Sequence, residues 1–281
     1  MGLAPSWNDA TAAVSLDARC LSHFFRRRKT YAVSKTERPC DPPAAPKIAI
    51  ACAQSYELAA HSIVRARPNP PQSDTMATLF DSISGAFALQ IIQYPHPTLR
   101  HLAKPLRRVD SDLRRMVREM FELMYEAKGV GLAATQVDLP YRLFVINLES
   151  NPQATDKEFV FLNPVITSRK GMTEAEEGCL SLPGLYGDVK RPEKVSLNAF
   201  DFAGNELTLA LDGLFARAVQ HEIDHLDGVL FIDRLSPTGA LAAKQAIADM
   251  ELVFAGKLER GEIPDDATIK RRLAELEKLR T

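Results

Sequence analysis

The pattern of apolar and polar positions predicts regular structure from Leu89 onward. After Asp110 or Ser111, either of which can serve as an N-cap, apolar residues recur at the spacing of a helix with one buried face: Leu113, Met116, Val117, Met120, Phe121 and Met124. Gly129 lies where we expect this helix to stop, because glycine accepts the left-handed conformation that ends many helices.

The rest of the chain predicts strands and further helices. Runs rich in Val, Ile, Leu and Phe predict strands over residues 142–148, 159–166, 194–202 and 206–211. A second helix is predicted from Asp212 to near Gly228, and amphipathic stretches over residues 240–256 and 266–280 predict two more. The strands are grouped between helices without regular strand–helix alternation, which indicates an α+β domain.

The first 75 residues differ in kind from the rest. They contain 8 of the 18 prolines and have 10 basic against 6 acidic side chains, whereas residues 76–281 have 25 basic and 30 acidic ones. We expect residues 1–75 to be a disordered extension, or to precede a true start at Met76, because proline fixes the backbone and removes a donor. An organelle-targeting segment and an interaction arm are the alternatives. A catalytic domain over residues 76–236 and a helical tail over residues 237–281 complete the expected organisation.

Composition excludes several classes of protein. With 35 Lys and Arg against 36 Asp and Glu, the chain lacks the positive charge of a protein that coats DNA or anionic lipid. It has neither an apolar run of about 18 residues nor the pattern of a secretory signal, so we predict no membrane span and no export. Cys179 is the only cysteine after residue 52, which favours a reducing compartment, the cytoplasm, over a disulfide framework.

The most specific chemical signal is His-Glu-Ile-Asp-His over residues 221–225 in the second predicted helix. Residues four apart project from one face of a helix, so both imidazoles can bind one metal ion, with Glu222 placed to act on a water molecule. Such a pattern also arises by chance on solvated helices. Here Leu214 and Ala218 continue the face of the two histidines, which favours the metal site of a hydrolase.

A catalytic metal site of this kind needs a third protein ligand, and the sequence offers Cys179. This thiol lies in Glu-Gly-Cys-Leu-Ser-Leu-Pro, residues 177–183, which we interpret as a tight polar turn. Gly178 would permit close backbone approach there, and Pro183 would limit a strand. The alternative is a lone cysteine that serves only as a small buried apolar residue. Its isolation in the folded part of the chain favours the ligand.

A third segment, Gly-Val-Gly-Leu-Ala-Ala-Thr-Gln over residues 129–136, directly follows the first predicted helix. It lacks the further glycines, or the Lys-Ser/Thr ending, of a phosphate-binding loop. Its small residues let a substrate approach the backbone, and the side-chain amide of Gln136 can donate a hydrogen bond to an oxyanion. We therefore expect this segment to contribute to a substrate site.

Taken in this order, residues 129–136, 177–181 and 220–225 closely resemble the three signature motifs of the peptide deformylase family. The resemblance extends from about Leu89 to Ser236 and includes a Tyr-Pro-His-Pro start and an Asp-Gly ending after the metal helix. It implies an α+β fold in which mixed antiparallel strands surround the metal-binding helix. It also implies removal of the formyl group from the N-terminal formylmethionine of nascent polypeptides, with release of formate.

The resemblance implies a role for individual residues at the reaction centre. The metal ligands would be Cys179, His221 and His225. Glu222 would be the general base, while the Gln136 amide and the backbone N–H of Leu180 would stabilise the negative charge on the formyl oxygen. Members of the family most often use Fe²⁺, and one thiolate with two imidazoles also suits Zn²⁺, Ni²⁺ or Co²⁺.

The resemblance also implies a set of substrate contacts. Gly131 would offer main-chain contacts to an extended peptide, which would add to the protein somewhat like a strand. The pocket for the methionine side chain would be lined by Val130, Leu214 and Ala218. Arg217 would cover that pocket with its stem and extend its charged head to solvent.

Partners and competing functions complete the expectations. We expect a monomer that binds neither DNA nor a membrane. Contact with the ribosome near the exit tunnel is a further hypothesis, with residues 26–29 and 266–281 as candidate contacts, although such mixed or short charge runs are more often solvated. A zinc endopeptidase would take its third ligand downstream of the helix, from Asp233 or Glu251. A metal-binding protein without turnover is the alternative from another class.

Overall fold

The computed structural model describes residues 14–15 and 89–281. The strands among them are β1 (Val14–Ser15), β2 (Arg108–Val109), β3 (Gly131–Ala133), β4 (Leu143–Ile146), β5 (Phe159–Lys170), β6 (Thr173–Cys179), β7 (Leu182–Arg191), β8 (Lys194–Phe200) and β9 (Glu206–Asp212). The α-helices are α3 (Ser111–Glu126), α4 (Gly213–Leu226), α5 (Pro237–Glu259) and α6 (Asp266–Arg280). Within these residues, no helix combines the length and the apolar character needed to cross a bilayer.

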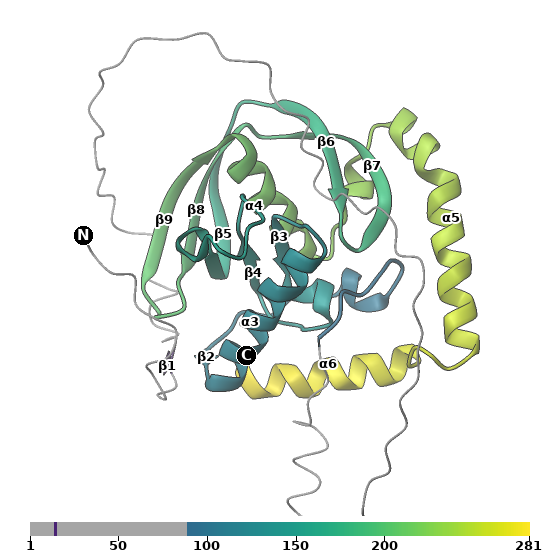
Figure 1. Cartoon of the computed structure of the whole chain (residues 1–281), viewed down its shortest axis with the longest axis horizontal. Coiled ribbons are helices and arrows are strands. Elements are labelled where there is room, and N and C mark those ends of the chain that lie inside the picture. Colours follow the sequence, from purple (N-terminus) through teal and green to yellow (C-terminus); the bar gives the residue numbers. More distant parts are fainter. Residues whose placement is uncertain (1–13, 16–88) are drawn as a thin grey trace, which may run out of the picture.

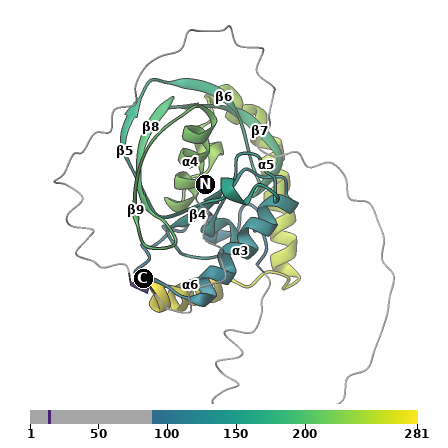
Figure 2. The ribbon, with the colours of Figure 1, turned by 60° about the vertical axis from the view of Figure 1, so that its left-hand side comes forward.

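The predicted α+β class is confirmed by the sheet topology. Five antiparallel strands form one sheet in the order β3-β4-β5-β8-β9, while β6 pairs with β7, and β1 with β2, in separate two-stranded sheets. Figure 1 shows α4 between the large sheet and the β6–β7 hairpin. Figure 2 shows β5, β8 and β9 curving past one side of the same helix. The predicted metal-binding helix is therefore central, as expected.

Helix α3 begins as its sequence predicts but ends differently. The Asp110 carboxylate caps it by accepting a hydrogen bond from the Leu113 N–H at 2.9 Å. At the other end, Lys128 adopts the left-handed conformation that we expected of Gly129, with φ of 55°. Gly129 instead packs closely on Leu180, because a Cβ there would lie 2.7 Å from the Leu180 side chain and would displace it.

The β6–β7 hairpin corrects the interpretation of residues 177–183 as a tight polar turn. Residues up to Cys179 belong to β6 and residues from Leu182 to β7, so only two residues form the turn. Pro183 does not limit a strand, because it is the second residue of β7. The register jumps there from Cys179–Leu182 to Gly178–Tyr186, and proline is tolerated in such a bulge because it need not donate to a ladder.

Helix α4 is buried over most of its length. All of its residues from Ala216 to Leu226 are buried. Its apolar side packs on the large sheet, where Val219 and Ile223 join a cluster that includes Phe144. The chain leaves α4 as predicted near Gly228, where a φ of 71° disfavours other residues and a Cβ would lie 2.7 Å from the carbonyl oxygen of Arg100.

Helix α6 packs on the domain with one face, and the expectation that its mixed charges are solvated is wrong for Arg280. Ile269 and Leu273 are buried, and so is Arg280 near the end of the helix. The Arg280 guanidinium donates to the Asp110 carboxylate at 3.0 Å and to the Tyr141 hydroxyl at 2.9 Å. The end of α6 is thereby tied to the N-cap of α3.

Replacing Arg280 with alanine should destabilise the fold by about 1–3 kcal/mol, because it leaves buried polar partners unsatisfied. The matched control is Lys278→Ala on the same helix, which breaks an exposed ion pair with Glu275 and should cost less than about 1 kcal/mol. Denaturant unfolding of both variants measures these changes in free energy. Equal losses in the two variants would contradict a structural role for the buried pair.

Candidate metal centre and active site

The three residues that the resemblance implies as metal ligands lie together. The ligand atoms of Cys179, His221 and His225 all lie within 4.8 Å of one another, and all three side chains are buried. The Cys179 Sγ lies 3.2 Å from the His225 Nε2. Strand β6 delivers the thiol at its last residue, while α4 presents both imidazoles from one face because they are four residues apart.

The chemistry of this group fits a divalent metal ion. One thiolate and two imidazoles suit Zn²⁺ and the neighbouring transition metals. Burial lowers the pKa of His225, as does the nearby His221, so its imidazole is neutral with a lone pair available. Burial would lower the pKa of His221 as well, but hydrogen bonds to Cys179 and Glu177 raise it to about 10. Surroundings that favour a proton on His221 also favour a metal cation beside it.

The downstream ligands required by the endopeptidase alternative are engaged elsewhere. Asp233 forms an ion pair with Arg100 and accepts a hydrogen bond from the Leu230 N–H at 2.8 Å. Glu251 accepts a hydrogen bond from the Tyr94 hydroxyl at 2.9 Å. Neither belongs to the group of potential metal ligands, whereas Cys179 does.

Glu177, whose carboxylate contacts the Nδ1 of His221, was not predicted from the sequence. Its Oε2 lies 3.0 Å from the His221 Nδ1, and its side chain has no exposed surface. Although burial alone would raise the pKa of Glu177, hydrogen bonds from Arg191 and His221 hold it well below its ordinary value, so the group is a carboxylate. Glu177 stands in the second motif, but the linear pattern gave no sign that it would face a histidine 44 residues away.

Arg217 corrects a second prediction. Instead of reaching solvent, its guanidinium is buried and donates to the Glu177 carboxylate at 2.6 Å and to the carbonyls of Val189 and Thr173 at 3.0 and 3.1 Å. The physical reason is the carboxylate of Glu177, because a buried negative charge is costly unless a cation pairs with it. Neither partner strand was predicted, so this pairing could not be found from the sequence.

The predicted general base, Glu222, is buried beside the metal group. Burial raises the pKa of its carboxyl to about 7, which is the range in which a general base exchanges protons efficiently. Within the described residues its Oε2 has no hydrogen-bond partner. Gly131 makes room for this side chain, because a Cβ there would lie 2.5 Å from the Glu222 Oε1. The glycine thus accommodates the carboxylate within the buried strand β3.

Gln136 lies in the short helix η2 (Ala134–Val137) with its amide orientation determined by hydrogen bonds. Its Oε1 accepts from the Ala133 N–H at 2.8 Å, and its Nε2 lies 3.4 Å from the Cys179 Sγ and 3.3 Å from the Ser181 Oγ. The donor end of the amide therefore points toward the metal group. Leu180 follows Cys179 directly, in the turn of the hairpin.

The residues predicted for the methionine pocket do not all face open space. Val130 and Ala218 are buried. Leu214 is 36% exposed and lines a cavity of about 390 Å³ near the start of α4, together with Arg217 and residues of β6. Only Leu214 of the three lines this cavity.

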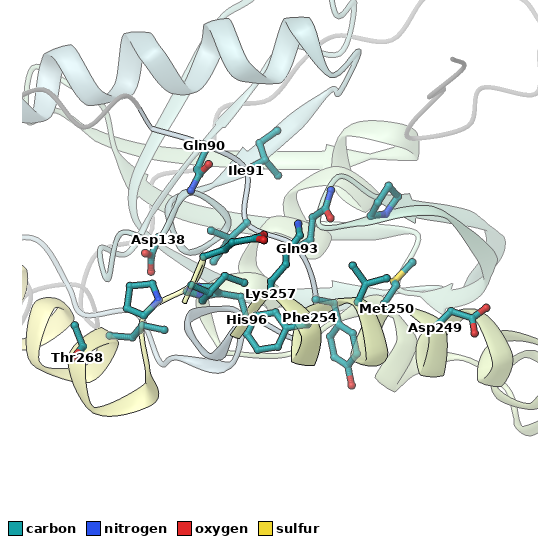
Figure 3. Close-up of a pocket in the computed structure, with 18 of the residues that line it drawn as sticks. Gln90, Ile91, Gln93, His96, Asp138, Asp249, Met250, Phe254, Lys257 and Thr268 are labelled. Carbon is teal, nitrogen blue, oxygen red and sulfur yellow. The ribbon is translucent and has the colours of Figure 1, made fainter. Parts of the chain in front are cut away.

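A larger groove of about 930 Å³ lies apart from the metal group. Figure 3 shows its walls, with Met250 and Phe254 from α5, Thr268 from α6 and Gln93 from the segment before β2. None of the three potential metal ligands lines it. Size alone therefore does not identify the reaction centre, and the chemistry of the donor set does.

Comparison with known proteins agrees with this chemistry. The sequence model of the polypeptide deformylase family matches residues 88–240. A peptide deformylase of Rhodopirellula baltica is 49% identical over 193 residues, which cover 69% of this chain and 96% of the relative. One from Neisseria meningitidis is 48% identical over 148 residues, covering 53% of this chain and 87% of the relative.

Solved structures give the same result. A plant peptide deformylase is 36% identical with a TM-score of 0.60, covering 64% of this chain and 97% of the plant chain. A peptide deformylase from Legionella pneumophila is 40% identical with a TM-score of 0.55, covering 59% and 97% of the two chains. With the matched motifs meeting at one buried Cys-His-His group, the chain belongs to the peptide deformylase family.

Proposed function

We propose that this centre removes the formyl group from the N-terminal formylmethionine of nascent polypeptides and releases formate. The observation that carries the proposal is the buried group of Cys179, His221 and His225, with the Glu222 carboxyl on the same helix. The family to which the chain belongs consists of metallohydrolases that remove an N-formyl group. The assignment of individual residues is our proposal.

The positions of the side chains support the catalytic roles that we propose for them. A divalent metal bound by the Cys-His-His group supplies Lewis acidity and makes water nucleophilic near neutral pH. Glu222 takes a proton from the attacking water and passes it to the leaving amine. The Gln136 amide, whose donor end points toward the metal group, and the backbone N–H of Leu180 stabilise the charge that develops on the formyl oxygen.

The substrate backbone is proposed to align beside β3. This strand lies at one edge of the five-stranded sheet, so an extended peptide can pair with it, with Gly131 as the main-chain contact. The methionine side chain is assigned to a pocket of Val130, Leu214 and Ala218. Among these, Leu214 supports the assignment most directly, because its side chain is partly exposed.

We propose Fe²⁺ as the physiological metal, with Zn²⁺, Ni²⁺ and Co²⁺ as alternatives that the same ligands accept. Cytoplasmic location is proposed because the buried thiol of Cys179 must stay reduced to bind metal. Targeting of an organelle by residues 1–75 is the alternative. Among candidate ribosome contacts, residues 266–281 cannot be tested by deletion alone, since α6 also buries Ile269 and Leu273.

The proposed reaction is tested by formate release from a formyl-methionyl peptide. Protein purified without oxygen and loaded with Fe²⁺ or Ni²⁺ should release formate, while the acetylated peptide should stay intact. A folded, metal-loaded sample that leaves the formyl peptide unchanged would instead favour a metal-binding protein without turnover.

Replacing Glu222 with alanine or glutamine should lower kcat by about 10²–10⁴-fold, because both variants lose the group that moves the proton. Metal content, measured by elemental analysis, should not change, since Glu222 is outside the ligand set. The matched control is Glu259→Gln, an exposed residue at the end of α5, which should keep wild-type kcat. Wild-type turnover by the Glu222 variants would remove this residue from the mechanism.

Exposure to oxygen should inactivate the iron-loaded protein, because both Fe²⁺ and a thiolate ligand are open to oxidation. Storage in air without reductant should lower iron content and formate release together, while the Ni²⁺-loaded protein should retain more activity. Elemental analysis beside the activity assay follows both quantities. Unchanged iron content and rate in air would contradict Fe²⁺ as the working metal.

A further inference from the structure

A line of buried charges connects the β6–β7 hairpin to α4 behind the metal group. Glu177 lies in β6, two residues before the end of that strand. Arg191 is the last residue of β7, and Asp224 lies in α4 between the two histidines. Their side chains are 0%, 3% and 10% exposed, respectively. The roles proposed above for the ligands, the base and the oxyanion donors make no use of Arg191 or Asp224.

The Arg191 guanidinium contacts both acids at once. Its Nε and Nη2 donate to the two oxygens of Glu177 at 2.6 and 2.8 Å, and its Nη1 donates to the Asp224 Oδ2 at 2.6 Å. A bidentate contact between a guanidinium and a carboxylate, as Arg191 makes with Glu177, fixes the plane of the carboxylate as well as its position. The same Glu177 Oε2 lies 3.0 Å from the His221 Nδ1, so the plane that Arg191 sets is the one His221 meets.

The two imidazoles are supported unequally. His221 has a carboxylate behind it, whereas the Nδ1 of His225 is buried and has no hydrogen-bond partner in the described part of the chain. The orientation of His221 therefore depends on Glu177, and the orientation of Glu177 depends on its cations. Asp224 is itself held from the other side by Arg234 of the short helix η4 (Phe231–Arg234), so Arg191 is anchored at both ends.

Arg191 and Arg217 are not equivalent partners of Glu177. Arg217 reaches one oxygen of the carboxylate and otherwise donates to backbone carbonyls of the hairpin strands. Only Arg191 spans from the carboxylate behind His221 to a second acid on the helix that carries His221. It can therefore set the distance between β6, which supplies the thiol, and α4, which supplies the imidazoles.

We propose that Arg191 is a positioning residue for the metal centre, acting by holding Glu177 against His221 while it clamps β7 to Asp224 of α4. The inference rests on the proposed metal binding by Cys179, His221 and His225. According to the inference, Arg191, which lies 30 residues before His221 in the chain, controls the orientation of the His221 imidazole. Partners behind a ligand of this kind contribute about 10–100-fold to metal affinity or activity in other metalloproteins.

The test compares Arg191→Met and Arg191→Lys with the wild type after loading each protein with Co²⁺. Arg191→Met should weaken Co²⁺ binding about 10–100-fold in competition with a chelator and should change the visible absorption spectrum of the bound ion. Its kcat should fall while KM for the formyl peptide stays the same. Arg191→Lys should recover only part of the loss, because an ammonium cannot bridge both acids with a planar fork.

The matched control is Arg280→Ala, which removes a buried cation whose side-chain partners, Asp110 and Tyr141, are not metal ligands. This variant should lower thermal stability and leave both the Co²⁺ spectrum and the Co²⁺ affinity unchanged. The control separates a positioning effect from general loss of stability, since a weakened fold alone would affect both variants in the same way.

A wild-type Co²⁺ spectrum and affinity in a folded Arg191→Met protein would overturn the proposal. If that variant does not fold, Arg191→Lys decides by the same two measurements, and wild-type values there would overturn the proposal equally. The spectrum reports on the ligands and not on turnover. A wild-type protein that binds Co²⁺ but releases no formate would therefore defeat the proposed reaction and leave the inference about Arg191 to be decided separately.

Discussion

The metal centre depends on the burial of one carboxylate, Glu177. An ionised group with no exposed surface is costly unless cations and hydrogen bonds surround it, and here they come from β7, from α4 and from the histidine it faces. Satisfying Glu177 therefore requires the hairpin and the central helix to meet in one arrangement. That arrangement is also the one that brings a thiol and two imidazoles together.

Space is the second constraint, and it is met by small residues. Gly129 leaves room for the Leu180 side chain, and Gly131 leaves room for the Glu222 carboxylate. These contacts join the segment after α3 to the hairpin on one side and to α4 on the other. The first motif thus fits between the second and third, which explains how three stretches far apart in sequence form one site.

The sequence allowed the periodic parts of this structure to be predicted, because burial leaves a local trace in α3, in α4 and in the strands β4, β5, β8 and β9 of the large sheet. The fifth strand, β3, was not predicted, because it has only three residues. The Cys-His-His group could also be predicted, because its residue types and spacing carry the chemistry. β6 left no such trace, since its first four residues are exposed, and β7 contains a proline and two glycines that resemble breakers. Arg217 was expected in solvent because its burial is decided by Glu177, an acid 40 residues away on that unpredicted hairpin.

The contact between Asp110 and Arg280 has a consequence for the order in which the molecule is completed. The two residues are 170 positions apart, so α3 leaves the ribosome long before the cation that holds its N-cap has been synthesised. Until then the cap and the Tyr141 hydroxyl lack this partner. Closing so long a loop is entropically expensive and comes late in folding. An enzyme that acts on chains still being made is thus itself completed only when its own synthesis has reached α6.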